Sequence, residues 1–384
     1  MSAYICVGLD GGNPLHALAA FGLLRLADRM APGARLGWRL EQAAWRPVLS
    51  TIDDPESWSE RAAQWLNALG RVGSPDPSLN RRVRELGSEV KKAQNRAKEI
   101  TKTAKAHAKA AKLDRDAAQA AFAAALAPIE MEIAILESDI AKAKTALAQA
   151  NGAGIAHLGD IIGVTPSIFR NAAETAIQQV LQSDNRSPQP TTDDPSLIAG
   201  QLAALGCDQI VDGEKISPTP YSFSNGSSGQ CLLKDVRSCM SDITAAMLMA
   251  TLNGTEGATV PGQTGLNWDP ADQRSYALAW DDPASAGKAA DAAANALAYL
   301  GLGLLPCMPG GRGLKACGWS SDKHFTWPIW GALLPISVVS SLLATPLDRG
   351  AIFLRQCGIQ ELRRSQVSNP SGKRNFFAPS IPIA

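Results

Sequence analysis

The stretch GLDGGNPLHALAAFGLLRLAD, residues 8–28, joins a short apolar run to a helix through a glycine-rich turn. Residues 4–9 (YICVGL) predict a buried strand. Asn13-Pro14 predicts where the helix begins, because Asn is a favoured N-cap residue and Pro is tolerated at the first helical position. Leucine and alanine then recur with helical spacing, so we expect a mostly buried helix. The turn could bind a phosphate or only connect two packed elements.

The residues of this turn favour the structural role. Gly8, Gly11 and Gly12 do not form the GxGxxG pattern, and the Lys and Ser/Thr of a Walker loop are missing. Pro14 removes a backbone N–H that a phosphate cradle would use, and Asp10 places a carboxylate where an anion would approach.

The composition is that of a globular chain with balanced charge. It has 384 residues, 45% of them hydrophobic, with 37 basic against 36 acidic side chains. This length suits one large domain or two ordinary ones, and any nucleic-acid surface must come from local segregation of charge. Seven cysteines without a CxxC pair argue against a zinc site and a disulfide framework, and predict a reducing, cytoplasmic location. Neither a signal peptide nor a membrane anchor is expected.

Residues 81–150 change abruptly to alanine and charge, and their apolar residues alternate three and four apart. One such seam consists of Val83, Leu86, Val90, Ala93, Ala97, Ile100, Ala104, His107 and Ala111, and a second of Phe122, Leu126, Ile129, Ile133, Leu136, Ile140, Ala143 and Leu147. The seams are one residue out of phase, with Pro128 near the break. An antiparallel coiled-coil hairpin with its tip near residues 112–119 explains both facts, and one long kinked helix is the alternative.

The first helix of this hairpin is strongly basic. Residues 81–115 contain twelve Lys or Arg and four Asp or Glu, a surplus of eight positive charges, whereas the second helix is mainly acidic. The candidates for a nucleic-acid contact are Lys91, Lys92, Lys98 and Lys102. A solvated coiled-coil face and a docking site for a protein partner are the alternatives.

The remaining sequence predicts a helix-rich α+β globular domain that the hairpin interrupts. Residues 1–80 form its N-terminal part, 81–150 the insertion and 151–384 the remainder. A strand pair is expected over 33–49 (GARLGWRLEQAAWRPVL), with further buried strands near 276–280 and 351–355. Helices are expected near 166–182, 196–205 and 231–253, and within 285–306, ending at Gly301 or Gly303.

Two further stretches combine positive charge with groups that suit nucleic acid. The Ser-Gly loop of SFSNGSSGQCLLKDVR, residues 222–237, opens a helix with Lys234 and Arg237 on its first turns, and either contacts phosphate or is only flexible. The tail places aromatic rings, Phe376 and Phe377, beside basic residues, which suits stacking and backbone contact, with a solvated strand edge as the alternative. Its basic candidates are Arg355, Arg363, Arg364, Lys373 and Arg374.

The aspartate-rich stretch 267–283 favours turn hydrogen bonds over a metal site. Arg274 within it is a further nucleic-acid candidate, with pairing to Asp269 or Asp281 as the structural alternative. None of the four histidines lies beside a Ser or Cys nucleophile in a recognisable motif. We therefore expect no enzyme, no catalytic residue, no metal and no cofactor.

Four blocks of sequence carry a resemblance to a known family. They are GLDGGNPLHALAAFGLLRL (8–26), PYSFSNGSSGQCLLKDVR (220–237), LNWDPADQRSYALAWDDP (266–283) and WPIWGALLPISVVSSLL (327–343). In this order they resemble proteins of type I-G (formerly I-U) CRISPR loci, namely the extension family of the helicase-nuclease and, more loosely, large-subunit-like proteins. None of the blocks is a catalytic signature. Residues 81–150 are outside the resemblance and look like an insertion.

The resemblance implies a non-enzymatic subunit or accessory of an RNA-guided antiviral complex that targets DNA. Such a protein would contact crRNA or target DNA, or dock the helicase-nuclease or other CRISPR effector proteins, with no membrane involved; base pairing reads the sequence in these complexes. Only residues 11–25 and 274–277 match closely enough to carry over, and neither block has an assigned role. The balanced net charge departs from that of a subunit that grips DNA. The alternative is a coiled-coil scaffold protein without nucleic-acid binding.

Overall fold

The chain is described by a computed structural model with a mixed α+β, helix-rich fold and small antiparallel sheets. The structure describes residues 2–71, 77–111, 114–150, 164–182, 194–223, 232–272, 289–311, 313–320, 323–347, 351–369 and 375–383. The chain divides into two compact units. The first combines Met1–Val72 with Gly154–Ala384, and the second is Gly73–Ala153.

A four-stranded antiparallel sheet organises the N-terminal part of the first unit. Its strands are β1 (Ser2–Ile5), β2 (Arg35–Glu41), β3 (Ala44–Thr51) and β11 (Leu334–Pro335), in the order β1-β3-β2-β11. The predicted strand pair over 33–49 is confirmed as the β2–β3 hairpin. Its two-residue turn places Gln42 and Ala43 at φ 49° and 63°, the backbone sign that hairpin turns of this length favour.

Strand β1 is shorter and less buried than the sequence predicts. The expected buried strand over 4–9 is wrong in extent, because the N–H of Val7 donates to the carbonyl of Ile5 at 3.1 Å in a tight turn that ends β1. Residues Ser2–Ile5 lie at the edge of the sheet and are exposed or half-buried. Apolar composition alone therefore overstated the strand.

The buried helix of the opening stretch is confirmed as α1 (Pro14–Met30). The side chain of Asn13 caps it by accepting the N–H of Leu15 at 2.9 Å, and Pro14 occupies the first turn. Helix α1 packs against α9 (Ala292–Gly301), which is buried along its whole length and ends at Gly301, one of the two expected positions. These two helices form the centre of the unit.

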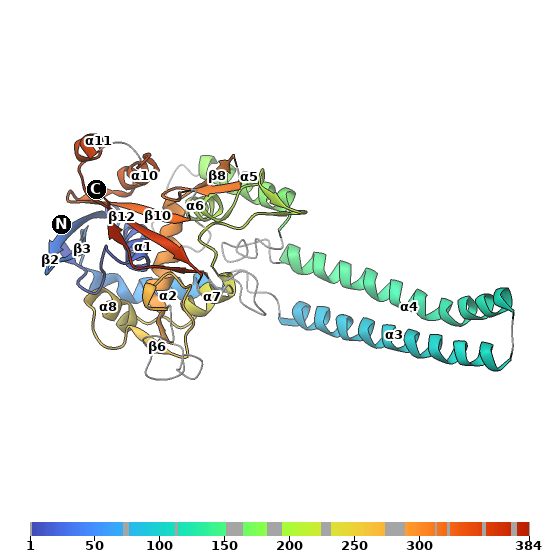
Figure 1. Ribbon diagram of the computed structural model, residues 1–384. Coiled ribbons are helices and arrows are strands. Elements are labelled where there is room, and N and C mark those ends of the chain that lie inside the picture. Colours follow the sequence, from blue (N-terminus) through green and yellow to red (C-terminus); the bar gives the residue numbers. More distant parts are fainter. Residues whose placement is uncertain are drawn as a thin grey trace, which may run out of the picture. The chain divides into compact units, whose positions relative to one another are not determined.

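A second antiparallel sheet is built from the C-terminal part of the chain. Strand β10 (His324–Trp330) pairs with β12 (Ile359–Ser368), and β12 also pairs with β13 (Phe376–Phe377) and β14 (Ile381–Pro382). Figure 1 shows β10 and β12 side by side. The strand predicted near 351–355 is wrong, because these residues form helix α11 (Ala351–Gln356). A short apolar run does not distinguish helix from strand, and Gly358, at φ 78°, reverses the chain before β12 begins.

The other elements of the first unit cover this core. The helices are α2 (Pro55–Arg71), α5 (Pro166–Gln182), α6 (Pro195–Leu205), α7 (Leu232–Met240), α8 (Ala245–Asn253) and α10 (Ile336–Ala344), with the 3-10 turns η4 (Pro270–Asp272) and η6 (Leu302–Leu304). Short hairpins pair β4 (Val211–Asp212) with β5 (Lys215–Ile216), β6 (Thr259–Pro261) with β7 (Ala289–Asp291), and β8 (Cys307–Gly310) with β9 (Gly313–Ala316).

Helices expected at 166–182 and 196–205 are confirmed as α5 and α6. The single helix expected over 231–253 is instead the pair α7 and α8. Thr244 ends the connection between them, because its hydroxyl accepts the N–H of Met247 and caps α8. The strand predicted at 276–280 lies outside the described residues.

Aromatic side chains from both ends of the sequence meet in the core. Trp38 of β2 and Trp330 of β10 pack edge to face with ring centroids 6.1 Å apart, and Phe21 of α1 contacts both rings. The indole N–H of Trp330 donates to the carbonyl of Leu36 at 3.0 Å. Segments separated by about three hundred residues therefore share one core, which makes the first unit strongly non-local.

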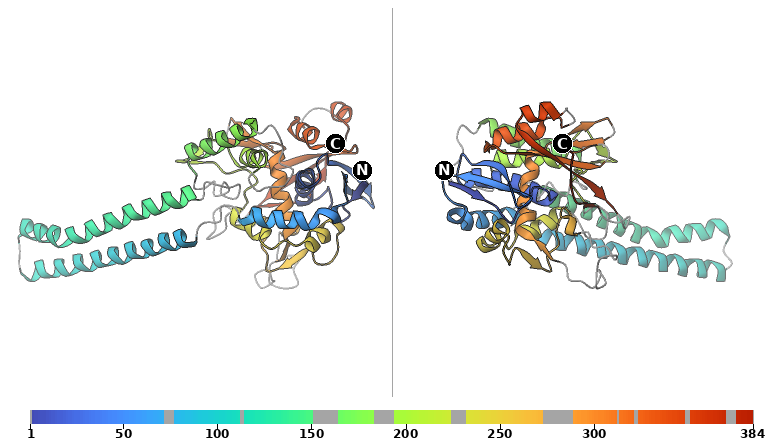
Figure 2. Two further views of the ribbon diagram at one scale, coloured as in Figure 1. Left: turned by 180° about the vertical axis from the view of Figure 1, so that it is seen from behind. Right: turned by 60° about the vertical axis from the view of Figure 1, so that its left-hand side comes forward.

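The second unit is a pair of long antiparallel helices in contact, α3 (Pro77–Ala110) and α4 (Arg115–Ala150) (Figure 1). Figure 2 shows them side by side from two further directions. One continuous kinked helix is therefore wrong: the chain turns back between Ala110 and Arg115, and Pro128 lies inside α4 without ending it.

Burial in the two helices follows the predicted alternation of three and four residues. Leu86, Val90 and Ala93 of α3 and Ile129 of α4 are buried, and the other described seam positions are mostly half-buried. The exceptions are His107 and Ala111, which are exposed, because Ala108 takes the half-buried place four residues after Ala104.

Within the described residues, one helical segment, Asp116–Ala143, is long and apolar enough to cross a membrane by length and composition. It contacts α3, and only 6% of its most apolar window is buried. A single segment of this kind is weak support for a membrane role, because length and composition alone also select alanine-rich helices of other proteins. The absence of a membrane partner stays a prediction.

Candidate functional site

The groups of the opening turn are engaged with the protein itself. The N–H of Gly11 donates to the carbonyl of Trp45 at 2.7 Å, and the N–H of Gly12 donates to the Asp10 carboxylate at 2.8 Å. The N–H of Asn13 donates to the carbonyl of Asp10 at 2.8 Å. A phosphate site would need these same N–H groups as donors. Because they already donate to oxygens of the protein, we infer a structural role for the turn.

The side chains of His16 and Asp269 also hold this turn in place. The Nδ1 atom of His16 accepts the N–H of Asp10 at 3.1 Å, and the amide of Asn13 donates to the Asp269 carboxylate at 3.0 Å. Burial lowers the pKa of His16, against the attraction of Asp269 and Asp10 that raises it. Asp269 also accepts the N–H of Ala271 at 2.9 Å, which confirms the turn interpretation for this aspartate.

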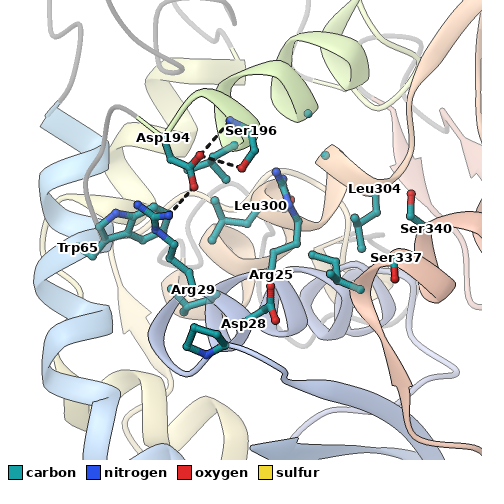
Figure 3. A pocket seen from close by; sticks show the side chains of 16 residues that line it. Arg25, Asp28, Arg29, Trp65, Asp194, Ser196, Leu300, Leu304, Ser337 and Ser340 are labelled. Atoms are coloured by element: carbon teal, nitrogen blue, oxygen red, sulfur yellow. Dashed lines mark hydrogen bonds and ion pairs between the residues drawn. The ribbon is translucent and has the colours of Figure 1, made fainter. Parts of the chain in front are cut away.

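A pocket of about 350 Å³ lies between α1, α2, α6, η6 and α10 (Figure 3). Its polar wall carries charged groups and hydroxyls, and its apolar wall is made of leucine, isoleucine and tryptophan side chains. The residues that matter below are Arg25, Arg29, Asp194, Ser196, Ser337 and Ser340. A cavity of this size and mixed lining is typical of small-molecule sites.

Arg25 enters the pocket from α1 toward α6 and the end of α9 (Figure 3). Its Nη1 atom donates to Oε1 of Gln201 at 2.8 Å and to the carbonyl of Leu300 at 2.6 Å. Burial lowers the pKa of the Arg25 guanidinium to about 10, and Asp194 opposes this shift from a distance. Within the described part of the chain, no carboxylate forms an ion pair with Arg25.

Arg29, one helical turn after Arg25, is held differently. Its Nη1 atom lies 2.7 Å from a carboxylate oxygen of Asp194, and the two side chains are 14% exposed each. Asp194 also caps α6 by accepting the N–H of Ser196 at 2.9 Å. Arg29 therefore has a carboxylate partner at the pocket wall, whereas Arg25 does not.

The basic residues of α3 fall on two different flanks of the helix. Residues seven apart in an α-helix lie within about 20° of one another. Arg84, Lys91, Lys98 and Lys105 therefore form one row, which Lys102 joins; all five are exposed. We call these five residues the basic stripe.

The basic stripe lies roughly 130° around the helix from the buried seam, at 100° per residue. The acidic residues of the described part of α3, Glu85, Glu89 and Glu99, fall on the opposite flank together with Lys92 and Arg96. Arg96 on that flank bonds Glu132 of α4 at 2.5 Å. Among the candidates from the sequence, the structure thus groups Lys91, Lys98 and Lys102 and separates Lys92.

Of the two tail rings that the sequence suggests for stacking, Phe376 is half-buried and Phe377 lies in the core. Phe377 is fully buried and packs on Phe223 and Phe325, so its ring is not available to a base. Arg363 contacts the Glu361 carboxylate, and Nε of Arg364 donates to the Thr326 hydroxyl at 3.3 Å. Strand pairing with β10, β13 and β14 draws this segment into the core, which the alternating pattern alone did not reveal.

The remaining sequence candidates are scattered over the first unit. Lys234 on α7 and Arg355 on α11 are exposed. Arg237 is half-buried and lies close enough to Tyr299 to oppose in part the rise that burial causes in the pKa of that phenol. Arg274, Lys373, Arg374 and the Ser-Gly loop 224–231 lie outside the described residues.

In the ranges that the structure describes, no group of three or more His, Cys, Asp or Glu side chains is arranged to hold a metal ion.

The described cysteines are free thiols. Burial raises the pKa of the Cys6, Cys239 and Cys307 thiols to about 12. Such thiols are protonated at neutral pH, which makes them poor nucleophiles.

The chain has no significant match among protein-family models, curated proteins or solved structures.

Sequence reasoning missed the pocket around Arg25. A signal for it was present, because Arg25 is a lone charge in the otherwise apolar run from Pro14 to Ala27.

Proposed function

We propose that this protein is a non-enzymatic subunit or accessory of an RNA-guided complex of the type I-G CRISPR kind, and that the basic stripe of α3 contacts a nucleic-acid backbone. The observation that carries this proposal is the row of five exposed Lys and Arg side chains without an acidic residue among them. The four blocks of family resemblance support the type of complex, with a cytoplasmic location and effector proteins as partners.

The spacing of the basic stripe suits backbone contact and not base reading. Seven residues of α-helix advance about 10.5 Å, so Arg84 to Lys105 cover roughly 31 Å along one side of the helix. Long Lys and Arg side chains at this spacing neutralise successive phosphates and release counterions, whatever the base sequence. Sequence reading by base pairing to a guide RNA complements such a surface.

The charge distribution explains how a chain of net charge +1 binds a polyanion. In the described side chains of α3, nine Lys or Arg stand against Glu85, Glu89 and Glu99, and these acids lie away from the stripe. Local potential governs association, so balanced total charge does not prevent it.

We further propose that α3 and α4 form an antiparallel coiled-coil hairpin inserted into the globular domain.

The test is a salt titration of binding to duplex DNA and to single-stranded RNA by fluorescence anisotropy. In the full chain, Lys91, Lys98, Lys102 and Lys105 are changed together to Gln. Loss of four phosphate contacts is expected to reduce the slope of log K against log salt by up to about 3.6 on duplex DNA.

A matched control changes four exposed lysines outside the stripe, Lys92, Lys142, Lys215 and Lys315, to Gln. It removes the same total charge, and we expect the wild-type slope. Equal losses in both variants would mean that only net charge matters. Absence of binding by the wild-type chain at low salt would contradict the proposal outright.

A coiled-coil scaffold without nucleic-acid binding is the second candidate. It is favoured by Met131 and Ile135, which are 68% and 57% exposed on the side of α4 away from its seam. Deleting residues 81–150 separates the two: a scaffold loses its protein partner in a pull-down, whereas loss of nucleic-acid binding together with the stripe supports the first function.

A further inference from the structure

We propose that the pocket between α1, α6, η6 and α10 binds the oxyanion of a small organic ligand, a carboxylate or a phosphate monoester, and that Arg25 is its principal anchor. This site lies within the first unit and goes beyond nucleic-acid binding by the basic stripe. Neither proposal depends on the other.

Among the residues that the structure describes, no carboxylate forms an ion pair with Arg25. Its two hydrogen bonds to described residues arise from Nη1 and end on uncharged oxygens, the Gln201 amide and the Leu300 carbonyl. The lowered pKa, about 10, reflects the cost of removing this charge from water. A charge held in this way is stabilised when a ligand supplies the opposite charge.

The surrounding backbone reserves space for the guanidinium. A Cβ atom at Gly200 of α6 would lie 2.8 Å from Nη2 of Arg25, and one at Gly303 of η6 would overlap Nη1. Gln201 is itself fully buried and fixed, because its amide nitrogen donates to the carbonyl of Tyr299 at 2.7 Å. The guanidinium is therefore oriented before any ligand arrives, which lowers the entropic cost of binding.

The protein offsets only part of the Arg25 charge. Leu300 lies in the last turn of α9, where aligned carbonyls carry roughly half a negative charge. The carboxylate of Asp194, which acts on Arg25 from a distance, is already 2.7 Å from Arg29. Asp28 also lines the pocket, and its carboxylate accepts the N–H of Gly33 at 2.9 Å. A positive potential consequently remains at Arg25.

The remaining lining defines the ligand class. A planar guanidinium with one terminal nitrogen that makes no hydrogen bond to the described residues suits a carboxylate or phosphate, and the hydroxyls of Ser337 and Ser340 offer further donors. Leu197, Leu304 and Ile336 provide an apolar wall for the organic part. A volume of about 350 Å³ limits the ligand to a small metabolite or a mononucleotide.

Isothermal titration calorimetry of the full chain tests this site with three probes: inorganic phosphate, AMP and succinate, each against a chloride buffer of equal ionic strength. We expect saturable binding of at least one probe with one site per chain. Binding of phosphate and AMP identifies a phosphate site, and binding of succinate identifies a carboxylate site.

Two variants locate the binding. Arg25→Gln keeps a polar side chain but removes the charge, and we expect affinity to fall at least roughly tenfold. Ser340→Leu narrows the pocket with Arg25 intact and is expected to have a similar effect, which keeps the test valid if Arg25→Gln fails to fold. The control Ser341→Leu, on the exposed side of α10, should bind like the wild type.

Two results would overturn the proposal. One is the absence of heat from every probe up to about 10 mM, a concentration that fills even a millimolar site. The other is wild-type affinity in both Arg25→Gln and Ser340→Leu. Neither result bears on the salt dependence of nucleic-acid binding, so failure here is distinguishable from failure of the basic stripe.

Discussion

Gly22 of α1 and Gly301 of α9 face each other where the two central helices cross. A Cβ atom at Gly22 would overlap the carbonyl of Leu297, and one at Gly301 would overlap the carbonyl of Leu18. The helix backbones are thus in direct contact. Each glycine is required by close approach, because both residues lie within ordinary helical backbone.

We expect Gly22→Ala to destabilise the first unit. The added methyl group cannot fit without separating α1 from α9, and overpacking of a core costs about 1–3 kcal/mol or more. The measurement is urea unfolding followed by tryptophan fluorescence. Gly87→Ala is the matched control, because Gly87 lies in α3 with open space around it and alanine should stabilise that helix by up to about 1 kcal/mol. Equal effects of the two substitutions would contradict the close packing of α1 and α9.

His16 predicts a loss of stability in mild acid. Burial lowers its pKa below the ordinary value of 6.5, so the unfolded chain takes up a proton that the folded chain resists. The His16 contribution is complete above pH 6.5 and falls as the pH drops below it, by up to about 1.4 kcal/mol per pH unit. Comparing urea unfolding of wild type and His16→Gln at pH 7.5 and 5.5 isolates it. The control, His107→Gln, changes an exposed histidine of α3, and the same pH dependence in all three proteins would refute the assignment.

Much of the local structure could be predicted, because it depends on neighbouring residues. Asn13-Pro14 fixed the start of α1, and the alternation in residues 81–150 identified the antiparallel pair α3 and α4. The short run 351–355 could not be assigned, because its conformation is decided by packing and not by pattern. Arg25 stands out as a lone charge in an apolar run, but the residues that surround it could not be predicted. Arg25 gains its partners from α6 and α9, some 176 and 275 residues away, and nothing in the sequence near Arg25 encodes them.

Asp194 has two roles that substitution can separate. Asp194→Asn keeps an acceptor for the N–H of Ser196 but loses the charge that faces Arg29, whereas Asp194→Ala loses both. We expect both variants to unfold at lower urea concentration than the wild type, with Asp194→Ala less stable by about a further 1 kcal/mol, the usual contribution of an N-cap. Identical midpoints for the two variants would show that the cap contributes nothing.

The cysteines should differ sharply in reactivity. Burial raises the pKa of Cys6, Cys239 and Cys307 to about 12, so almost no thiolate is present at pH 8, and the sulfur atoms are also shielded. Cys357 is exposed. Brief treatment with N-ethylmaleimide, followed by peptide mass spectrometry, should modify Cys357 first and the other three only in urea. Rapid native modification of Cys6 would be inconsistent with its place in the core.

The contacts that the opening turn and α1 make with the C-terminal half of the chain delay their folding during synthesis. Trp327 donates to the carbonyl of Gly11 at 2.8 Å, and Ser380 bonds the carbonyl of Gly12, so the opening turn is complete only when β10 and the tail have been translated. At ordinary elongation rates the ribosome needs roughly ten to fifty seconds to travel from α1 to α9. During that interval the face of α1 that packs against α9 lacks this partner, whereas α3 and α4 can already pair. We therefore expect the opening turn of a nascent chain to stay without its native hydrogen bonds until the last strands emerge.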